Sequence, residues 1–182
     1  MIDFALEHTL RPLDAEIART TQPRHLAILN NFREHLLAEL AGDVDAIMKT
    51  QCAEPQYHFY GSGTGDFGPK GGAAVREFYS NIFALGYNKL RYVADRFVVA
   101  DRALFHEGQM EIVFPGRALQ AMGLPVDDLA GNYVFSYRQA AVFHYDANGA
   151  CTGEDTYSDG PLTPERLRKL TPAEEATLPR GR

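Results

Sequence analysis

The second half of the chain alternates apolar and polar residues over long stretches, and this pattern restricts the fold more than any other feature. Three segments, residues 89–100, 103–114 and 132–145, are rich in aromatic and β-branched residues with a period near two, which is typical of β-strands. Residues 151–159 are expected to form a fourth strand. Short turns at Asp101-Arg102 and at 146–149 join two pairs of these segments, whereas parallel neighbours need a crossover of about a dozen residues. The pattern therefore predicts a run of antiparallel strands.

The first half follows a helical period instead. Between residues 23 and 41 the apolar positions recur every three or four residues, which predicts an amphipathic helix that ends at Gly42. Asp43 can cap a short second helix, and a third helix is expected from about residue 73 to 85. One early strand, 56–60, lies between the second and third helices. This order predicts an α+β fold in which helices cover one face of a curved sheet.

Length and composition limit the classes of protein further. With 182 residues, 45% of them hydrophobic, the chain fits a single domain, 1–182, with one buried core. A formal charge of −6 provides no basic surface for nucleic acid.

No run reaches the roughly 18 apolar residues of a membrane span, and the charged N-terminus does not resemble a signal peptide. Cys52 and Cys151 lack C-x-x-C spacing and fit a reducing compartment better than a disulfide framework, although a single bridge is also compatible. We therefore expect a cytoplasmic protein with neither a nucleic-acid nor a membrane partner.

The segment 60–72, YGSGTGDFGPKGG, contains the glycine spacing of a dinucleotide-binding loop at Gly63, Gly65 and Gly68. Such a loop opens a helix within a parallel β-α-β unit and is followed by an acidic residue about 20 positions further on. That position falls near Phe83, inside the third predicted helix, and four residues separate Gly68 from the start of that helix. We therefore interpret the glycines as a flexible connection between strand and helix.

Other catalytic signatures are also missing from the sequence. Ser62 has Tyr60 and Thr64 where the glycines of a G-x-S-x-G nucleophile elbow would be. There is no H-x-x-x-H or H-E-x-x-H spacing, and the adjacent His106 and Glu107 would point to opposite faces of a strand. We expect neither a metal nor another cofactor.

Alternation along the predicted strands selects the side chains that can face a pocket. His106 and Met110 share a face with apolar residues, so His106 is expected to point inward. It is either a core histidine with satisfied nitrogens or part of a catalytic site. In the next strand one face carries an aromatic row that includes Phe135 and Tyr137. This row is a pocket wall with phenol donors, ordinary sheet packing or a dimer interface.

The first and last strands add polar candidates. His58 is in phase with Tyr60, and Asp155 is in phase with Tyr157. A carboxylate beside an imidazole in a poorly hydrated pocket forms a general acid/base pair, so we expect Asp155 to pair with His106 or His58. The alternative is that the acidic residues of the last strand face water at the end of an edge strand.

Two further polar residues interrupt apolar strands. Arg96 is either an internal partner for a carboxylate or a residue on the solvent side. His144 alternates with the aromatic row and is expected on the opposite, outer face of the sheet.

The order of elements and these residues together resemble the nuclear transport factor 2-like superfamily, in particular its SnoaL-like polyketide cyclase branch. The segments that carry the resemblance are HLAILNNFREHLLAELAGDVDAIMKTQCAEPQYHFYG, GPKGGAAVREFYSNIF, RFVVADRALFHEGQMEI and VFHYDANGACTGEDTYSD. The resemblance covers about residues 22–160, which leaves 1–21 as an N-terminal extension and 161–182 as a C-terminal tail. It implies a cone-shaped barrel, in which a strongly curved antiparallel sheet is closed by three helices around a pocket, and a homodimer that pairs through the sheet.

For activity, the resemblance implies cofactor-independent acid/base chemistry of the isomerase, cyclase or dehydratase type on a small hydrophobic carbonyl or cyclic compound. His106 would be the base, Asp155 its orienter, and Tyr60 or Tyr137 a donor to the developing enolate oxygen. The candidate catalytic residues are His106, Asp155, His58 and Tyr60, and the candidate substrate-binding residues are Tyr137, Tyr157, Arg96, Phe135 and Met110. The alternative is a non-catalytic protein that binds a small hydrophobic ligand, or a dimerisation module, because fold alone does not select an activity.

Overall fold

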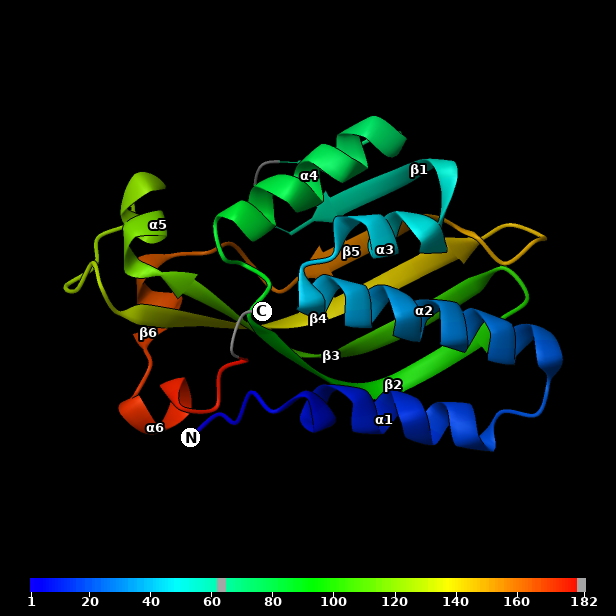
Figure 1. Cartoon of the computed structure of the whole chain (residues 1–182), viewed down its shortest axis with the longest axis horizontal. Coiled ribbons are helices and arrows are strands. Elements are labelled where there is room, and N and C mark those ends of the chain that lie inside the picture. Colours follow the sequence, from blue (N-terminus) through cyan, green and yellow to red (C-terminus); the bar gives the residue numbers. More distant parts are fainter. Residues whose placement is uncertain (62–64, 180–182) are drawn as a thin grey trace.

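The computed structural model of the chain describes residues 1–61 and 65–179. The helices in these residues are α1 (Leu6–Arg19), α2 (Pro23–Ala41), α3 (Val44–Thr50), α4 (Gly72–Ala84), α5 (Gly116–Ala121) and α6 (Pro172–Glu175), with one 3-10 turn, η1 (Pro164–Arg166). The strands are β1 (Gln51–Tyr60), β2 (Leu90–Ala100), β3 (Ala103–Pro115), β4 (Asn132–Tyr145), β5 (Cys151–Ser158) and β6 (Leu167–Lys169). These strands form one sheet in the order β1-β5-β4-β3-β2, with β6 paired to β4 (Figure 1).

The pairs β2–β3, β3–β4 and β4–β5 are antiparallel, which confirms the predicted run. β1 is the exception, because it pairs with β5 in parallel, with His58 opposite Asp155. A parallel pair needs a long connection, and β2, β3 and β4 all lie between these two strands in the sequence. β1 therefore forms one edge of the sheet and β2 the other.

The predicted helices are present at the expected positions. α2 ends at Gly42, and the Asp43 side chain accepts a hydrogen bond from the backbone N–H of Ala46 (2.9 Å) at the start of α3. α4 matches the third predicted helix. α1 is an additional helix within the segment 1–21, where the sequence reasoning assigns no element, and its Leu13 is 1% exposed.

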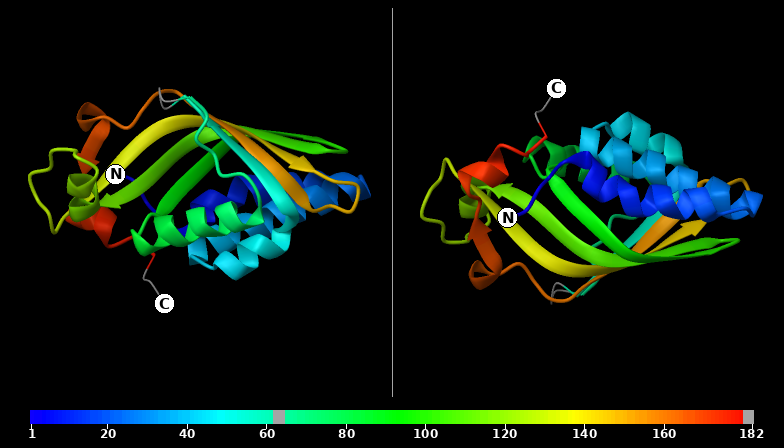
Figure 2. Two further views of the ribbon diagram at one scale, coloured as in Figure 1. Left: turned by 90° about the horizontal axis from the view of Figure 1, so that it is seen from above. Right: turned by 90° about the horizontal axis from the view of Figure 1, so that it is seen from below.

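The sheet curves strongly, and α1, α2, α3 and α4 lie on its concave side (Figure 2). Irregular pairing accompanies the curvature, with register shifts between Ala94 and Arg96 in β2 and, opposite His144 and Tyr145 of β4, between Cys151 and Gly153 in β5. A bulge of this kind bends its strand and changes which side chains point inward.

The main core fills the space between the helices and the concave face. It includes Leu13 of α1, Phe32 of α2, Leu104 of β3 and Phe143 of β4. None of the helices in the described part of the chain combines the length and the apolar character that crossing a membrane requires.

The connection between β1 and α4 does not form a dinucleotide site in the residues that the structure describes. Gly63, the first glycine of the pattern, lies outside these residues. The strand after α4 is β2, at the opposite edge of the sheet from β1, so α4 does not belong to a parallel β-α-β unit. A Cβ atom on Gly68 would lie 2.2 Å from the carbonyl oxygen of Tyr57, so this glycine allows two backbone segments to approach closely.

Candidate active site

A cavity of about 420 Å³ lies between the helices and the concave face of the sheet. Its wall is largely aromatic and aliphatic, from Phe32 on α2 and Tyr79 on α4 to Phe135 on β4. Among the described residues, the charged side chains that line it are Glu39 and Glu154. The cavity therefore combines a hydrophobic wall with two carboxyl groups.

His106 points from β3 into this wall, as its alternation predicts, and is 2% exposed. The Tyr92 hydroxyl lies 2.6 Å from His106 Nδ1, and the imidazole packs among Phe32, Phe97 and Phe143. His106 Nε2 has no hydrogen-bond partner among the described residues. When the phenol donates to Nδ1, the hydrogen of the neutral ring is on Nε2.

Burial lowers the pKa of His106 to about 3, so its imidazole is neutral at pH 7. A group with this pKa is a weak base at neutral pH, because efficient general bases have pKa values near the operating pH. The position of His106 therefore suits hydrogen bonding to a ligand better than proton abstraction.

Glu154 projects from β5 into the cavity, on the same face of the strand as Thr156 and Ser158. Its carboxyl group accepts a hydrogen bond from the Thr156 hydroxyl, and the residue is 9% exposed. Burial outweighs this hydrogen bond and raises the pKa of Glu154 to about 7. Glu154 is therefore a carboxyl group that can gain or lose a proton near neutral pH.

Glu39 reaches the same cavity from α2. Burial, together with repulsion from Glu154, raises the pKa of Glu39 to about 8. Its carboxyl group has no hydrogen-bond or ion-pair partner among the described residues. Around pH 7 to 8 the pair thus offers an ionised carboxylate and a protonated carboxylic acid in one cavity.

Phe135, Tyr137 and Met110 line the cavity, on the face that alternation selects. Phe135 and Tyr137 stack with ring centroids 4.7 Å apart, and the Tyr137 hydroxyl donates to Gln139 Oε1 (3.1 Å). Burial raises the pKa of Tyr137, so its hydroxyl keeps its proton at neutral pH. This hydroxyl is a neutral hydrogen-bonding group in the wall.

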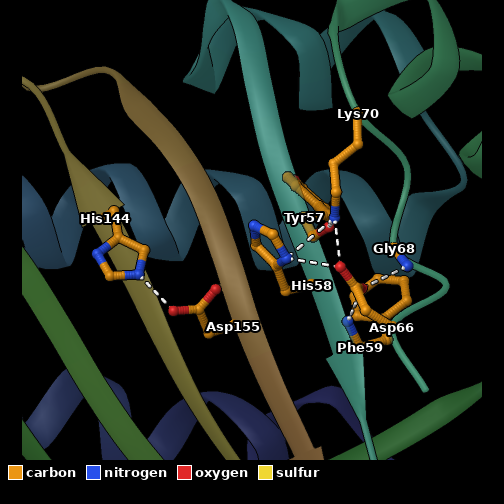
Figure 3. Close-up of polar contacts among 8 residues, drawn as sticks. All are labelled: Tyr57, His58, Phe59, Asp66, Gly68, Lys70, His144 and Asp155. Atoms are coloured by element: carbon orange, nitrogen blue, oxygen red, sulfur yellow. Dashed lines mark hydrogen bonds and ion pairs between the residues drawn. The ribbon is translucent and has the colours of Figure 1, made fainter.

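Asp155 does not face the cavity, and the predicted pair of Asp155 with His106 or His58 is not formed. Asp155 Oδ2 instead lies 2.9 Å from Nε2 of His144, which is on the outer face as predicted (Figure 3). Successive side chains of a strand alternate between faces, so the inward position of Glu154 places Asp155 outward.

His58 also lies away from the cavity. Its Nδ1 is 2.7 Å from Oδ2 of Asp66, which accepts a second hydrogen bond from Lys70 Nζ at 3.0 Å (Figure 3). The hydrogen bond from Lys70 is the largest cause that holds the pKa of Asp66 well below its usual range. The inward side chains of β1 are Tyr57, which is fully buried, and Phe59, which lines the cavity.

Tyr60 contributes to the cavity lining and stacks on Tyr157 at a centroid distance of 5.0 Å, but Tyr157 itself is 48% exposed and outside the lining. Arg96 also points outward, with Nε 3.2 Å from Glu107 Oε1 and a side chain that is 64% exposed. The register shift in β2 changes the phase of the strand, so Phe97 faces the core in place of Arg96. Arg96 and Tyr157 are therefore not positioned to bind a ligand in this cavity.

Neither protein-family profiles nor curated protein sequences gave a match to this chain. Solved structures match it at low identity. A protein from Jannaschia sp. CCS1, described as a SnoaL-like polyketide cyclase, is 12% identical with a TM-score of 0.59 over 78% of this chain and 91% of its own. A nuclear transport factor 2-like protein from Anabaena variabilis is 13% identical with a TM-score of 0.56 over 77% and 94%. SalBIII, an epoxide hydrolase/cyclase-like enzyme of pyran ring formation in the polyether salinomycin, is 12% identical with a TM-score of 0.54 over 79% and 95%.

The chain has the nuclear transport factor 2-like fold. This confirms the α+β fold that the sequence pattern predicts and the cone shape that the resemblance implies. In this nuclear transport factor 2-like cone, the cavity lies where the helices meet the concave face of the sheet, and Glu39 and Glu154 enter it from these two opposite sides.

Sequence reasoning missed both glutamates of the nuclear transport factor 2-like cavity. Glu154 belongs to the segment GEDTYSD, in which polar residues occupy both faces and no apolar row marks the inward one. Glu39 follows Leu36 by three residues, on the buried face of α2. A carboxyl group on an apolar helix face was the available signal, because buried carboxyl groups are rare and concentrate at functional sites.

Proposed function

We propose that the protein is an enzyme that moves protons on a small hydrophobic carbonyl or cyclic compound held in the cavity, as an isomerase, cyclase or dehydratase does without a cofactor. One observation carries the proposal, namely that Glu154 and Glu39 share a largely apolar cavity of about 420 Å³. The similarity to SalBIII, which is described in pyran ring formation, supports a cyclic compound.

The two carboxyl groups divide the reaction between them. The ionised Glu154 takes a proton from the carbon next to the carbonyl group, and the electrons of that C–H bond move into the enolate. The protonated Glu39 donates a hydrogen bond to the enolate oxygen, where negative charge develops. Glu154 then returns its proton to the same carbon or, where a conjugated double bond makes the intermediate a dienolate, to its γ-carbon, so the reaction is balanced and the enzyme is restored.

Glu154 thereby takes the role of base that the sequence reasoning gives to His106. The pKa of Glu154, about 7, is close to the operating pH, whereas that of His106, about 3, is far below it. His106 and Tyr137 are neutral wall residues that bind and orient the substrate. The competing function is a non-catalytic pocket for a hydrophobic ligand, which needs no proton transfer.

Deuterium exchange separates the two functions. Cyclic ketones such as tetralone and decalone would be incubated with the protein in deuterium oxide, and loss of the proton signal next to the carbonyl would be followed by NMR. We expect the wild type to exceed the buffer rate and Glu154→Gln to lower the enzymatic rate at least about 100-fold, as for removal of a general base.

Glu34→Gln is the matched control, because Glu34 lies on the exposed side of the helix that carries Glu39. It should exchange at the wild-type rate. Equal exchange by the wild type and Glu154→Gln would reject Glu154 as the base. Ketone binding without any exchange above buffer would favour the non-catalytic pocket.

A further inference from the structure

Among the described residues, the cavity presents two carboxyl groups and no permanently cationic side chain. No Lys or Arg contributes to its lining in the described part of the chain. Arg166 lies over the Phe135 ring, 4.9 Å from its centroid, but it is paired with Asp159 at 2.5 Å, so its charge is already balanced. A buried carboxylate without a cationic partner is costly to ionise. Glu39 and Glu154 are therefore complementary to a ligand that brings its own positive charge.

Both carboxyl groups have free hydrogen-bonding capacity. Glu154 is nine-tenths buried, with 9% exposure, and its hydrogen-bond partner is the uncharged Thr156 hydroxyl. Glu39 approaches from the opposite side of the cavity, and no described residue pairs with it. An ammonium group has three N–H donors and no acceptor, which matches carboxylate oxygens without other partners.

The wall around the two glutamates is rich in aromatic rings. Tyr79 on α4 and Tyr137 on β4 line the cavity, and Phe135 stacks on Tyr137. Burial raises the pKa values of both tyrosines, and the charges of Glu39 and Glu154 add to the effect, as expected for groups that lie close together. The faces of aromatic rings attract cations, and their area also favours an apolar ligand body.

We propose that the ligand of this cavity is a small hydrophobic amine, bound as its ammonium ion by Glu39 and Glu154 with its apolar body against the aromatic wall. The inference rests on the proposed function, since it takes the same cavity as the substrate site and names the class of substrate. In this complex both carboxyl groups accept hydrogen bonds from the N–H donors of the ammonium group.

A pair of probes with the same shape and different charge tests the inference. Adamantylamine and adamantanol differ in an ammonium group against a hydroxyl group, and an alkylammonium keeps its proton up to about pH 10. Calorimetric titration of the full chain at pH 8 would measure both affinities. We expect adamantylamine to bind the wild type at least about tenfold more tightly, because a hydrogen bond to a charged group contributes more than a neutral one.

Variants assign the preference to the two carboxyl groups. Glu154→Gln and Glu39→Gln should each reduce the affinity for adamantylamine about tenfold and leave the affinity for adamantanol unchanged, because the amide keeps the shape and removes the charge. Glu34→Gln should retain the wild-type preference. Thermal unfolding of each variant would verify that it is folded.

Three results would overturn the amine class. They are equal affinity of the wild type for the two probes, a preference that survives both glutamine substitutions, and failure of both probes to bind. Ketone exchange without a preference for the amine would contradict the amine class and leave the proposed function intact. A preference for the amine without ketone exchange would support the amine class and contradict the proposed proton transfer.

Discussion

The pair Glu154 and Glu39 gives the proposed reaction a definite dependence on pH. Glu154, with a pKa of about 7, must lose its proton to act as the base, and Glu39, with a pKa of about 8, must keep its proton to act as the donor. The exchange rate should therefore rise with pH up to about 7 and fall above about 8. At pH 5, about two units below the pKa of Glu154, we expect a rate about 100-fold below the maximum. Initial rates of ketone exchange between pH 5 and 10 would measure this profile.

The Glu39→Gln variant checks the assignment of the alkaline limb. Its amide is a neutral donor at every pH, so the decrease above pH 8 should disappear while the acid limb stays. A rate that stays constant from pH 7 down to pH 5 would instead exclude Glu154 as the base and agree with His106, whose pKa of about 3 lies below that range.

Individual inward residues could be predicted where a strand carries its own apolar row. Met110 and Phe135 mark the inward faces of β3 and β4, so His106 and Tyr137 followed from alternation. On β5 there is no such row, and acidic residues occupy both faces, so the sequence alone does not favour Glu154 over Asp155 as the inward residue. The alternation itself was correct on this strand, but nothing local identifies which of two polar faces is covered by helices.

At the scale of elements, the parallel pair of β1 and β5 depends on one close approach. A Cβ atom on Gly153 would lie 2.0 Å from the carbonyl oxygen of Gln56, and the φ of Gly153 is 154°. We expect Gly153→Ala to reduce the free energy of unfolding by about 3 kcal/mol, because strain and overpacking each cost about 1 to 3 kcal/mol. Urea unfolding followed by circular dichroism would measure the change.

Gly123→Ala provides the comparison. Gly123 has a φ of 81°, but a Cβ atom there would have no neighbour within 4 Å. Its substitution therefore measures the backbone cost alone, about 1 kcal/mol. If both variants lost the same stability, the contact between β1 and β5 would not be the cause.

The extent of most elements follows from local signals, and their pairing does not. Helix caps and periodicity lie within a few residues of each other, so α2, α3 and the antiparallel strands were predictable. The pairing of β1 with β5 joins residues about 100 positions apart, such as Gln51 with Cys151. No turn or short connection in the sequence indicates such a pair. The rule that consecutive strands are neighbours in the sheet does not predict it either.

At the scale of the whole molecule, α1 closes an edge of the sheet. Figure 1 shows α1 running along β2, which is an edge strand. Thr9 Oγ1 accepts a hydrogen bond from the backbone N–H of Tyr92 (3.2 Å), so this edge has a partner for one of its donors. The helix α1 was not predicted from the sequence, because Pro12 lies within it and charged residues are frequent in the segment 1–21.

The contribution of α1 to stability can be measured with two leucines of the same helix. Leu13 is 1% exposed and belongs to the main core, whereas Leu6 is 46% exposed. Leu13→Ala should lower the free energy of unfolding by about 3 kcal/mol through lost burial and a cavity, and Leu6→Ala by less than about 0.5 kcal/mol. Urea unfolding of both variants would give the two values. If the loss for Leu13→Ala were as small as that for Leu6→Ala, α1 would be an appendage, and α2, α3 and α4 alone would close the cone.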